Sequence, residues 1–116
     1  MLKIIKILLL KLGYSLAGIR DTWITERSFR QWFLLTIISD FVAFIYAPNM
    51  MWLVIIIVIG LLLLAAELIN TAIETIVNKV EPEIHPLAKK AKDAGSAMTF
   101  VTFLALLITW FGMLNA

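Results

Sequence analysis

The sequence predicts an all-α membrane protein in which an N-terminal amphipathic surface helix precedes three transmembrane helices. Hydrophobic residues make up 62% of the 116 residues, above the roughly 45–50% of soluble domains. They gather into stretches of about 20 residues, the length at which a helix crosses a bilayer. Residues 1–116 are therefore expected to form a single membrane domain.

Residues 2–23 are expected to form the surface helix. Apolar residues recur there at helical spacing, but Lys3, Lys6 and Lys11 interrupt them. Such a helix lies in the membrane interface with its lysine ends reaching water, and it is too interrupted to span.

The three spans are expected at residues 29–47, 50–77 and 94–114. The first contains Asp40, and a carboxylate in hydrocarbon is costly, so Asp40 should face protein. The helical pattern of the second continues to about Val80, beyond the thickness of a bilayer. Its last turns should therefore reach the headgroup region.

Charge predicts the orientation of the spans. All ten basic residues lie in the N-terminal region or in the segment after the second span. Because lysine and arginine collect on the cytoplasmic side, the N-terminus and residues 78–93 should be cytoplasmic and the C-terminus on the opposite side. The net charge of +2 is modest, and no nucleic acid is expected as a partner. The chain has no cysteine, which excludes disulfides and thiolate chemistry.

A polar stripe marks the end of the second span. On a helix with about 100° per residue, its members fall within an arc of roughly 100°. The stripe should face a bundle interior or a subunit interface. It consists of Glu67, Asn70, Thr71, Glu74 and Asn78.

The two carboxylates of the stripe point to function. Asparagine and threonine often bridge membrane helices at about 0.6 kcal/mol per contact, so packing alone can explain Asn70 and Thr71. An ionised carboxylate costs several kcal/mol in hydrocarbon, which packing does not justify. Glu67 lies about 10 Å deeper than Glu74 along the helix axis. Glu67 is thus placed to meet a lipid head group, and Glu74 a soluble ligand or a divalent cation.

The segment after the second span adds polar groups that suit a polyphosphate, because lysines and a carboxylate-bound cation neutralise phosphate charge. For Lys89 and Lys90, a solvated cluster obeying the positive-inside rule is the simpler explanation. A lone histidine such as His85 is more often structural than catalytic. The polar set comprises Glu83, His85, Lys89, Lys90, Lys92 and Asp93.

Two long motifs resemble one family. ELINTAIETIVN followed by EIHPLAKKAKDAGSA, together with the upstream GYSLAGIRDTWITERSFRQ, is similar to the small integral membrane diacylglycerol kinases of bacteria. The resemblance covers residues 13–110. It implies an oligomeric helical bundle, a homotrimer in the inner membrane with active sites shared between subunits. The trimer would transfer the γ-phosphate of ATP to a lipid alcohol with Mg²⁺.

The resemblance also assigns residues. Glu67 matches the general base and Asn70 its supporting neighbour, while Glu26 and Glu74 match carboxylates linked to magnesium. The ATP-binding set is Tyr14, Glu26, Glu74, Glu83, Ile84, His85, Lys92 and Asp93. The lipid-binding set is Arg20, Trp23, Ser28, Phe29, Arg30, Gln31, Glu67 and Ser96.

The chain departs from the family at a few positions. Asn78 stands where the family usually has aspartate, and Ile7 stands where it has an early arginine. Either Lys6 or Lys11 substitutes for that arginine, or its contact is lost. The resemblance assigns no role to Asp40.

Chemistry agrees with this assignment, because a carboxylate shielded from water can accept the proton of a lipid hydroxyl. The related undecaprenol kinases share the core motif, but the GYSLAGIRDTW and KDAGSA stretches favour diacylglycerol. A proton- or cation-conducting oligomer is an alternative of another class. It would need polar residues along the whole span, whereas residues 53–64 are apolar. A scaffold for other membrane proteins would not explain the carboxylates.

Overall fold

The computed structural model describes residues 1–80 and 85–116. Within these ranges every regular element is a helix: α1 (Leu2–Thr25), α2 (Arg27–Tyr46), α3 (Met50–Val80) and α4 (Pro86–Leu114). The predicted all-α fold class is confirmed.

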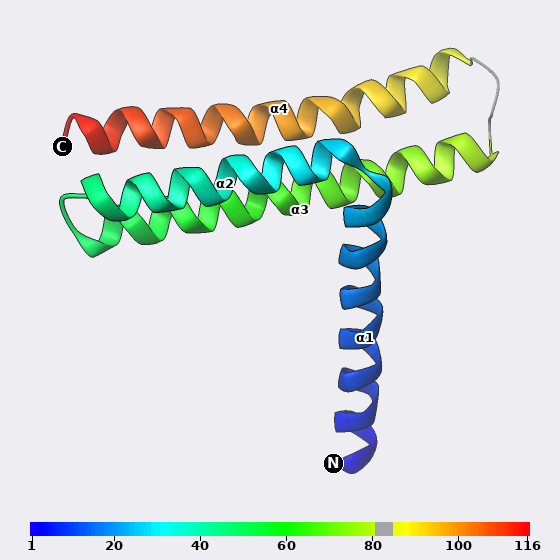
Figure 1. Cartoon of the computed structure of the whole chain (residues 1–116). Helices are drawn as coiled ribbons and strands as arrows, with labels where there is room; N and C mark the ends of the chain where they lie inside the picture. Colours follow the sequence, from blue (N-terminus) through cyan, green and yellow to red (C-terminus); the bar gives the residue numbers. More distant parts are fainter. Residues whose placement is uncertain (81–84) are drawn as a thin grey trace.

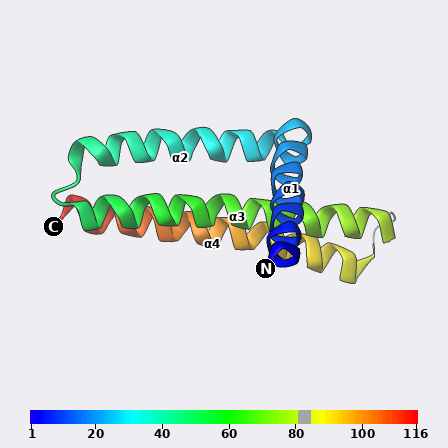
Figure 2. The same cartoon turned by 90° about the horizontal axis from the view of Figure 1, so that it is seen from below.

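Helix α3 is the centre of the molecule. Helices α2 and α4 run alongside it and both pack on it, so the three form one elongated bundle (Figures 1 and 2). Helix α1 projects sideways from the bundle and meets α2 and α3 through its C-terminal end (Figure 1). Thr22 is its buried residue, so most of α1 packs on no other part of the described chain.

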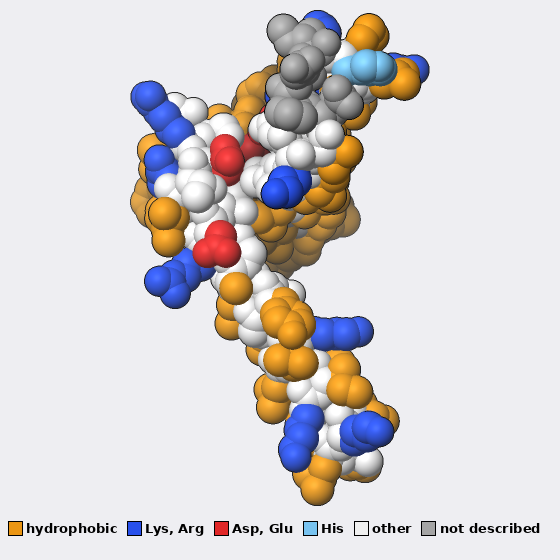
Figure 3. Space-filling view, turned by 90° about the vertical axis from the view of Figure 1, so that its right-hand side faces the viewer, with side chains coloured by type: hydrophobic (Ala, Val, Ile, Leu, Met, Phe, Trp, Pro, Cys, Tyr) orange, Lys and Arg blue, Asp and Glu red, His pale blue; other side chains and the backbone are white. Residues whose placement is uncertain are grey.

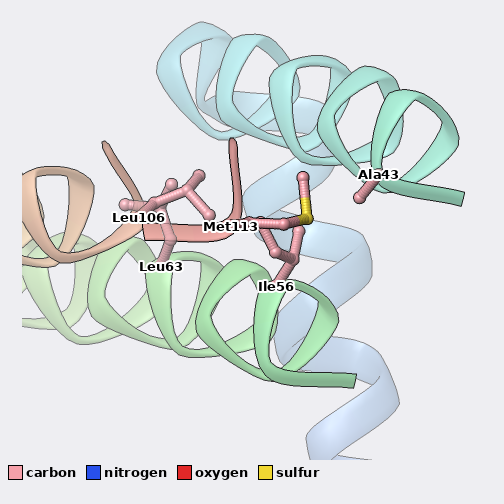
Figure 4. Close-up of a cluster of buried hydrophobic side chains, with 5 residues drawn as sticks. All are labelled: Ala43, Ile56, Leu63, Leu106 and Met113. Atoms are coloured by element: carbon pink, nitrogen blue, oxygen red, sulfur yellow. The ribbon is translucent and has the colours of Figure 1, made fainter. Parts of the chain in front are cut away.

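The apolar core lies where α2, α3 and α4 come together away from α1. Figure 4 shows the side chains of Ala43 on α2, Ile56 and Leu63 on α3, and Leu106 and Met113 on α4. These residues interdigitate across the three helices, which fixes how α2 and α4 lie on α3.

Two aromatic contacts join α2 directly to α4. The Trp32 and Phe103 rings lie with centroids 5.1 Å apart. Further along, the Trp110 Nε1 atom donates a hydrogen bond to the Ser39 Oγ atom at 2.8 Å. These contacts bridge the two outer helices across α3.

Asp40 lies on the side of α2 that faces α3, as expected for a carboxylate within a span. Its Oδ1 atom is buried, and a Cβ atom placed on Gly60 of α3 would be 3.8 Å from it. The contact is possible because glycine brings the α3 backbone close to α2.

The helix junctions follow from local chemistry. Glu26 has an extended backbone (φ −110°, ψ 106°) and ends α1 while it begins α2, so the chain turns sharply there. The Asn49 side chain accepts a hydrogen bond from the Trp52 backbone N–H at 3.2 Å, which satisfies a donor in the first turn of α3.

Helix α4 begins at Pro86, earlier than the expected start of the third span near residue 94. The His85 Nδ1 atom accepts a hydrogen bond from the Leu87 backbone N–H at 3.1 Å, so His85 caps the helix. Proline suits the next position because its fixed φ matches a helix and it lacks an N–H that would need a partner. The two residues together start the helix before the apolar stretch begins.

Helices α2, α3 and α4 are each long and apolar enough to cross a membrane. They leave large hydrophobic side chains such as Phe44, Ile108 and Phe111 exposed on the outside of the bundle. Lipid would cover such residues. The protein is therefore a multi-pass membrane protein.

Candidate functional site

Glu67 is buried on α3 with only 5% of its surface exposed. The Ser28 Oγ atom donates a hydrogen bond to its Oε2 atom at 3.1 Å. Ser28 can reach Glu67 because Glu26 interrupts the helix and places Ser28 in the first turn of α2. The contact leaves the second carboxylate oxygen, Oε1, without a donor from the described chain. The hydrogen bond thus holds the Glu67 carboxylate in a position sheltered from bulk water.

Asn70 and Glu74 lie one turn apart on α3 and extend this polar site. The Asn70 Nδ2 atom donates to the Glu74 Oε1 atom at 3.5 Å, a long and weak contact. The Asn70 Oδ1 atom is buried and accepts no hydrogen bond from the described residues. Helix α4 closes over it, since a Cβ atom on Gly95 would lie only 2.5 Å from this oxygen. The close approach of α4 thus limits the Asn70 amide to few orientations.

The polar contacts continue where α3 ends and α4 begins. The Lys92 Nζ atom donates a hydrogen bond to the Asn78 Oδ1 atom at 3.0 Å. Lys89 instead pairs with Asp93 at 2.6 Å, and both of these side chains are exposed. The two predicted ATP ligands Lys92 and Asp93 therefore have different partners in this structure.

The predicted polar stripe does not face a single neighbour. Glu67 contacts α2, whereas Asn70 and Asn78 contact α4. Thr71 instead lines an open groove of about 630 Å³ between α1 and α3, together with Ser15, Thr22, Leu68 and Thr75. An arc of roughly 100° on a central helix is wide enough to meet more than one helix.

Three residues of the predicted lipid set, Trp23, Phe29 and Arg30, contact one another at the bend between α1 and α2. The Trp23 ring packs edge to face against Phe29, with centroids 6.4 Å apart, and against Phe33, with centroids 5.1 Å apart. Arg30 donates hydrogen bonds to the backbone carbonyls of Trp23 and Ile24. It thereby satisfies acceptors at the C-terminal end of α1 and holds the bend.

Other predicted residues lie on the surface, apart from these contacts. Arg20 and Tyr14 are exposed on α1, Gln31 on α2 and Ser96 on α4. No hydrogen bond in the described chain links them to Glu67. Glu83 and Ile84, both predicted to bind ATP, lie outside the described residues.

Charged side chains surround the end of the bundle at which α3 ends and α4 begins. Figure 3 looks onto this end and shows acidic side chains where α1 meets the bundle, with lysine and arginine side chains around them. Among the described residues, no group of three or more histidine, aspartate or glutamate side chains could hold a metal ion. Mg²⁺ often takes only one or two carboxylates and completes its shell with phosphate oxygens and water. The two carboxylates predicted to hold Mg²⁺ are both partly exposed, Glu26 at the α1–α2 junction and Glu74 on α3.

Two contacts in this site have no direct signal in the amino-acid sequence. Gly95 is a small residue that permits close helix packing, and the sequence marks Asn78 only as a departure from a family pattern. The glycine does signal close packing, but periodicity does not tell which residue of another helix will lie opposite it.

Comparison with known proteins decides which family has this arrangement. The sequence profile described as prokaryotic diacylglycerol kinase matches residues 13–114. That range includes the α1–α2 bend, the polar part of α3 and the start of α4. The chain belongs to this family.

Members of the diacylglycerol kinase family from several bacteria are similar along most of their length. The diacylglycerol kinase of Pseudomonas aeruginosa is 43% identical over 98 residues, which cover 84% of this chain and 80% of that protein. The Escherichia coli K12 enzyme is 34% identical with the same coverage. The Haemophilus influenzae enzyme is 35% identical over 101 residues, or 87% of this chain and 86% of that protein. These matches confirm the predicted family and the predicted class of enzyme, a lipid kinase.

Proposed function

We propose that this protein transfers the γ-phosphate of ATP to the free hydroxyl of diacylglycerol and so makes phosphatidic acid. The observation that carries the proposal is the buried Glu67 carboxylate, held by Ser28, on the helix that also presents Glu74 and Asn78. Family membership supports the same reaction. A base within the membrane, together with groups at the membrane surface that bind phosphate, suits a substrate with a lipid part and a polar part.

Glu67 is the proposed general base. Its carboxylate accepts the hydroxyl proton as the lipid oxygen attacks the γ-phosphorus; the bond from that phosphorus to the β–γ bridging oxygen breaks, and ADP leaves. Proton removal by a well-placed base contributes about 10²–10⁴ in rate. Ser28 orients the carboxylate through its hydrogen bond. Asn70 supports the same region from the next turn of α3.

Glu74, Glu26 and Lys92 are the proposed phosphate-side groups. Phosphoryl transfer depends mainly on positioning and on neutralising phosphate charge. Glu26 and Glu74 would hold Mg²⁺, which would offset the charge of the phosphates when it is bound with ATP. Lys92 adds an ammonium group near the end of α3. The proposed nucleotide site also includes Tyr14, Glu83, Ile84, His85 and Asp93.

The site also suggests an assembly and an orientation. Tyr14 is 66% exposed, and α1 packs little on its own bundle, so a neighbouring subunit could meet it. We infer a homotrimer with shared active sites in the bacterial inner membrane. The N-terminus and residues 78–93 would lie in the cytoplasm, where ATP is found, and the C-terminus on the opposite side.

A lipid substrate assay tests the proposal. Purified protein in mixed micelles receives γ-labelled ATP with diacylglycerol or with undecaprenol, with Mg²⁺ present or removed by a chelator. We expect label in phosphatidic acid, dependence on Mg²⁺, and little transfer to undecaprenol. Preferential labelling of undecaprenol would assign the other lipid, and no labelling of either alcohol would refute the kinase proposal.

A further inference from the structure

The end of α3 and the start of α4 are joined by a hydrogen bond between side chains. The Lys92 Nζ atom donates to the Asn78 Oδ1 atom at 3.0 Å, across 14 positions of sequence. Asn78 is exposed, and Lys92 is partly buried. The contact therefore fixes where a flexible lysine side chain ends without removing it from the solvent.

The partner of Lys92 differs in charge from the partner of Lys89. Lys89 is paired with the Asp93 carboxylate at 2.6 Å, and that carboxylate offsets its positive charge. The Asn78 carboxamide is neutral, so it orients the Lys92 ammonium and leaves the charge in place. An ammonium has three N–H donors. One donor serves Asn78, and the others can bind an anion.

We propose that Asn78 is a positioning residue that holds the Lys92 ammonium ready for the phosphates of ATP without neutralising its charge. This inference rests on the proposed function, in which Lys92 binds phosphate. A held lysine loses less rotational freedom when the phosphate arrives than a free one. A carboxylate at position 78 would hold the lysine equally well, but it would compete with the phosphate for the same charge.

Two variants separate positioning from charge. Asn78→Asp keeps an acceptor near Lys92 but adds a negative charge, while Asn78→Ala removes the acceptor and adds none. We expect Asn78→Asp to raise the KM for ATP about threefold, the size of a surface ion pair, and to do so less at high salt. Asn78→Ala should raise it about twofold at any salt concentration, because one hydrogen bond is lost.

Val80→Asp is the matched control. Val80 is 73% exposed in the last turn of α3, and about 200° around the helix from Asn78. The Val80→Asp variant adds the same charge as Asn78→Asp at nearly the same depth, but on the side of the helix away from Lys92. We expect its KM for ATP to match that of the unmodified protein. The KM for diacylglycerol should change by less than about twofold in the position 78 variants, because the hydrogen bond does not involve the lipid side of the site.

Binding without turnover gives an independent measurement. The Kd of a non-hydrolysable ATP analogue, measured by equilibrium dialysis, should follow the same order as the KM values. The inference is wrong if Asn78→Asp binds the analogue as tightly as the unmodified protein or more tightly, or if Val80→Asp weakens binding equally. If the unmodified protein transfers no phosphate to any lipid, the proposed function fails instead, so the two failures are distinguishable.

Discussion

The two halves of α3 use different kinds of contact. From Met50 to Leu63 the buried residues Ile56 and Leu63 pack against apolar side chains of α2 and α4 (Figure 4). From Ala66 to Val80 the buried residues include Glu67 and Asn70, which meet Ser28 and Glu74 through hydrogen bonds. One continuous helix therefore acts as a packing element at one end and as the wall of a site at the other.

The contrast teaches where sequence change should affect activity and where it should affect stability. Removing part of an apolar side chain lowers the stability but leaves the packing in place, because the contacts are many and individually weak. The polar half depends on a few atoms in set positions. Variants in the polar half should alter phosphate transfer, and variants in the apolar half should alter unfolding.

The largest effect is expected at Glu67. Glu67→Gln keeps the size of the side chain but removes the base, so phosphate transfer to diacylglycerol should fall about 10²–10⁴-fold. The labelled-ATP assay measures this change. Ser28→Ala is the control, because it keeps the carboxylate and removes only one hydrogen bond, and it should cost about tenfold or less. Near-normal transfer by Glu67→Gln would exclude Glu67 as the base.

The next effect is expected in the apolar half. Leu63→Ala leaves a cavity beside Leu106 and should lower the free energy of unfolding by about 2–3 kcal/mol. Unfolding in detergent mixtures with increasing dodecyl sulfate measures this. Leu62→Ala is the matched control, since Leu62 is 56% exposed next to it in the chain. Activity per folded molecule should stay unchanged in both variants. A strong loss of activity in folded Leu63→Ala would break the division between the two halves.

Two glycines give a finer comparison: Gly95 of α4 packs on the polar half of α3, and Gly60 lies in the apolar half. A Cβ atom on Gly95 would lie 2.5 Å from the Asn70 Oδ1 atom, whereas one on Gly60 would lie 3.5 Å from the nearest Thr36 atoms. Gly95→Ala should therefore displace Asn70, costing about 1–3 kcal/mol in stability and lowering transfer. Gly60→Ala makes an ordinary contact and should change both by little. The same unfolding and transfer assays apply, and equal effects of the two variants would contradict the geometry.

The smallest effect is expected between α2 and α4. Trp110→Phe removes the hydrogen bond to Ser39 but keeps an aromatic ring, so stability should fall by about 0.6 kcal/mol. A double-mutant cycle with Ser39→Ala isolates the contact, because the second substitution should cost nothing further in the Trp110→Phe background. Additive effects would mean that the hydrogen bond contributes nothing.

Much of the candidate site could be predicted from the sequence, because the motif around Glu67 is both polar and regular within an apolar helix. Ser28 was assigned to the lipid set by resemblance, and the structure places it on Glu67. Arg30 was assigned to the same set, but its hydrogen bonds go to the backbone of α1. The contacts of Asn78 and Gly95 could not be predicted, since both depend on where α4 lies relative to α3.

The sequence by itself determined the class of this protein, the number of helices that can span a membrane and the helix that carries the carboxylates. These follow from apolar length and helical period, which are local properties of the chain. The tertiary structure alone decided that α1 leaves the bundle at Glu26, that α4 closes over Asn70, and that Lys92 meets a neutral amide. The physical reason is that periodicity specifies which face of a helix is buried, but the packing of helices in space specifies what that face meets.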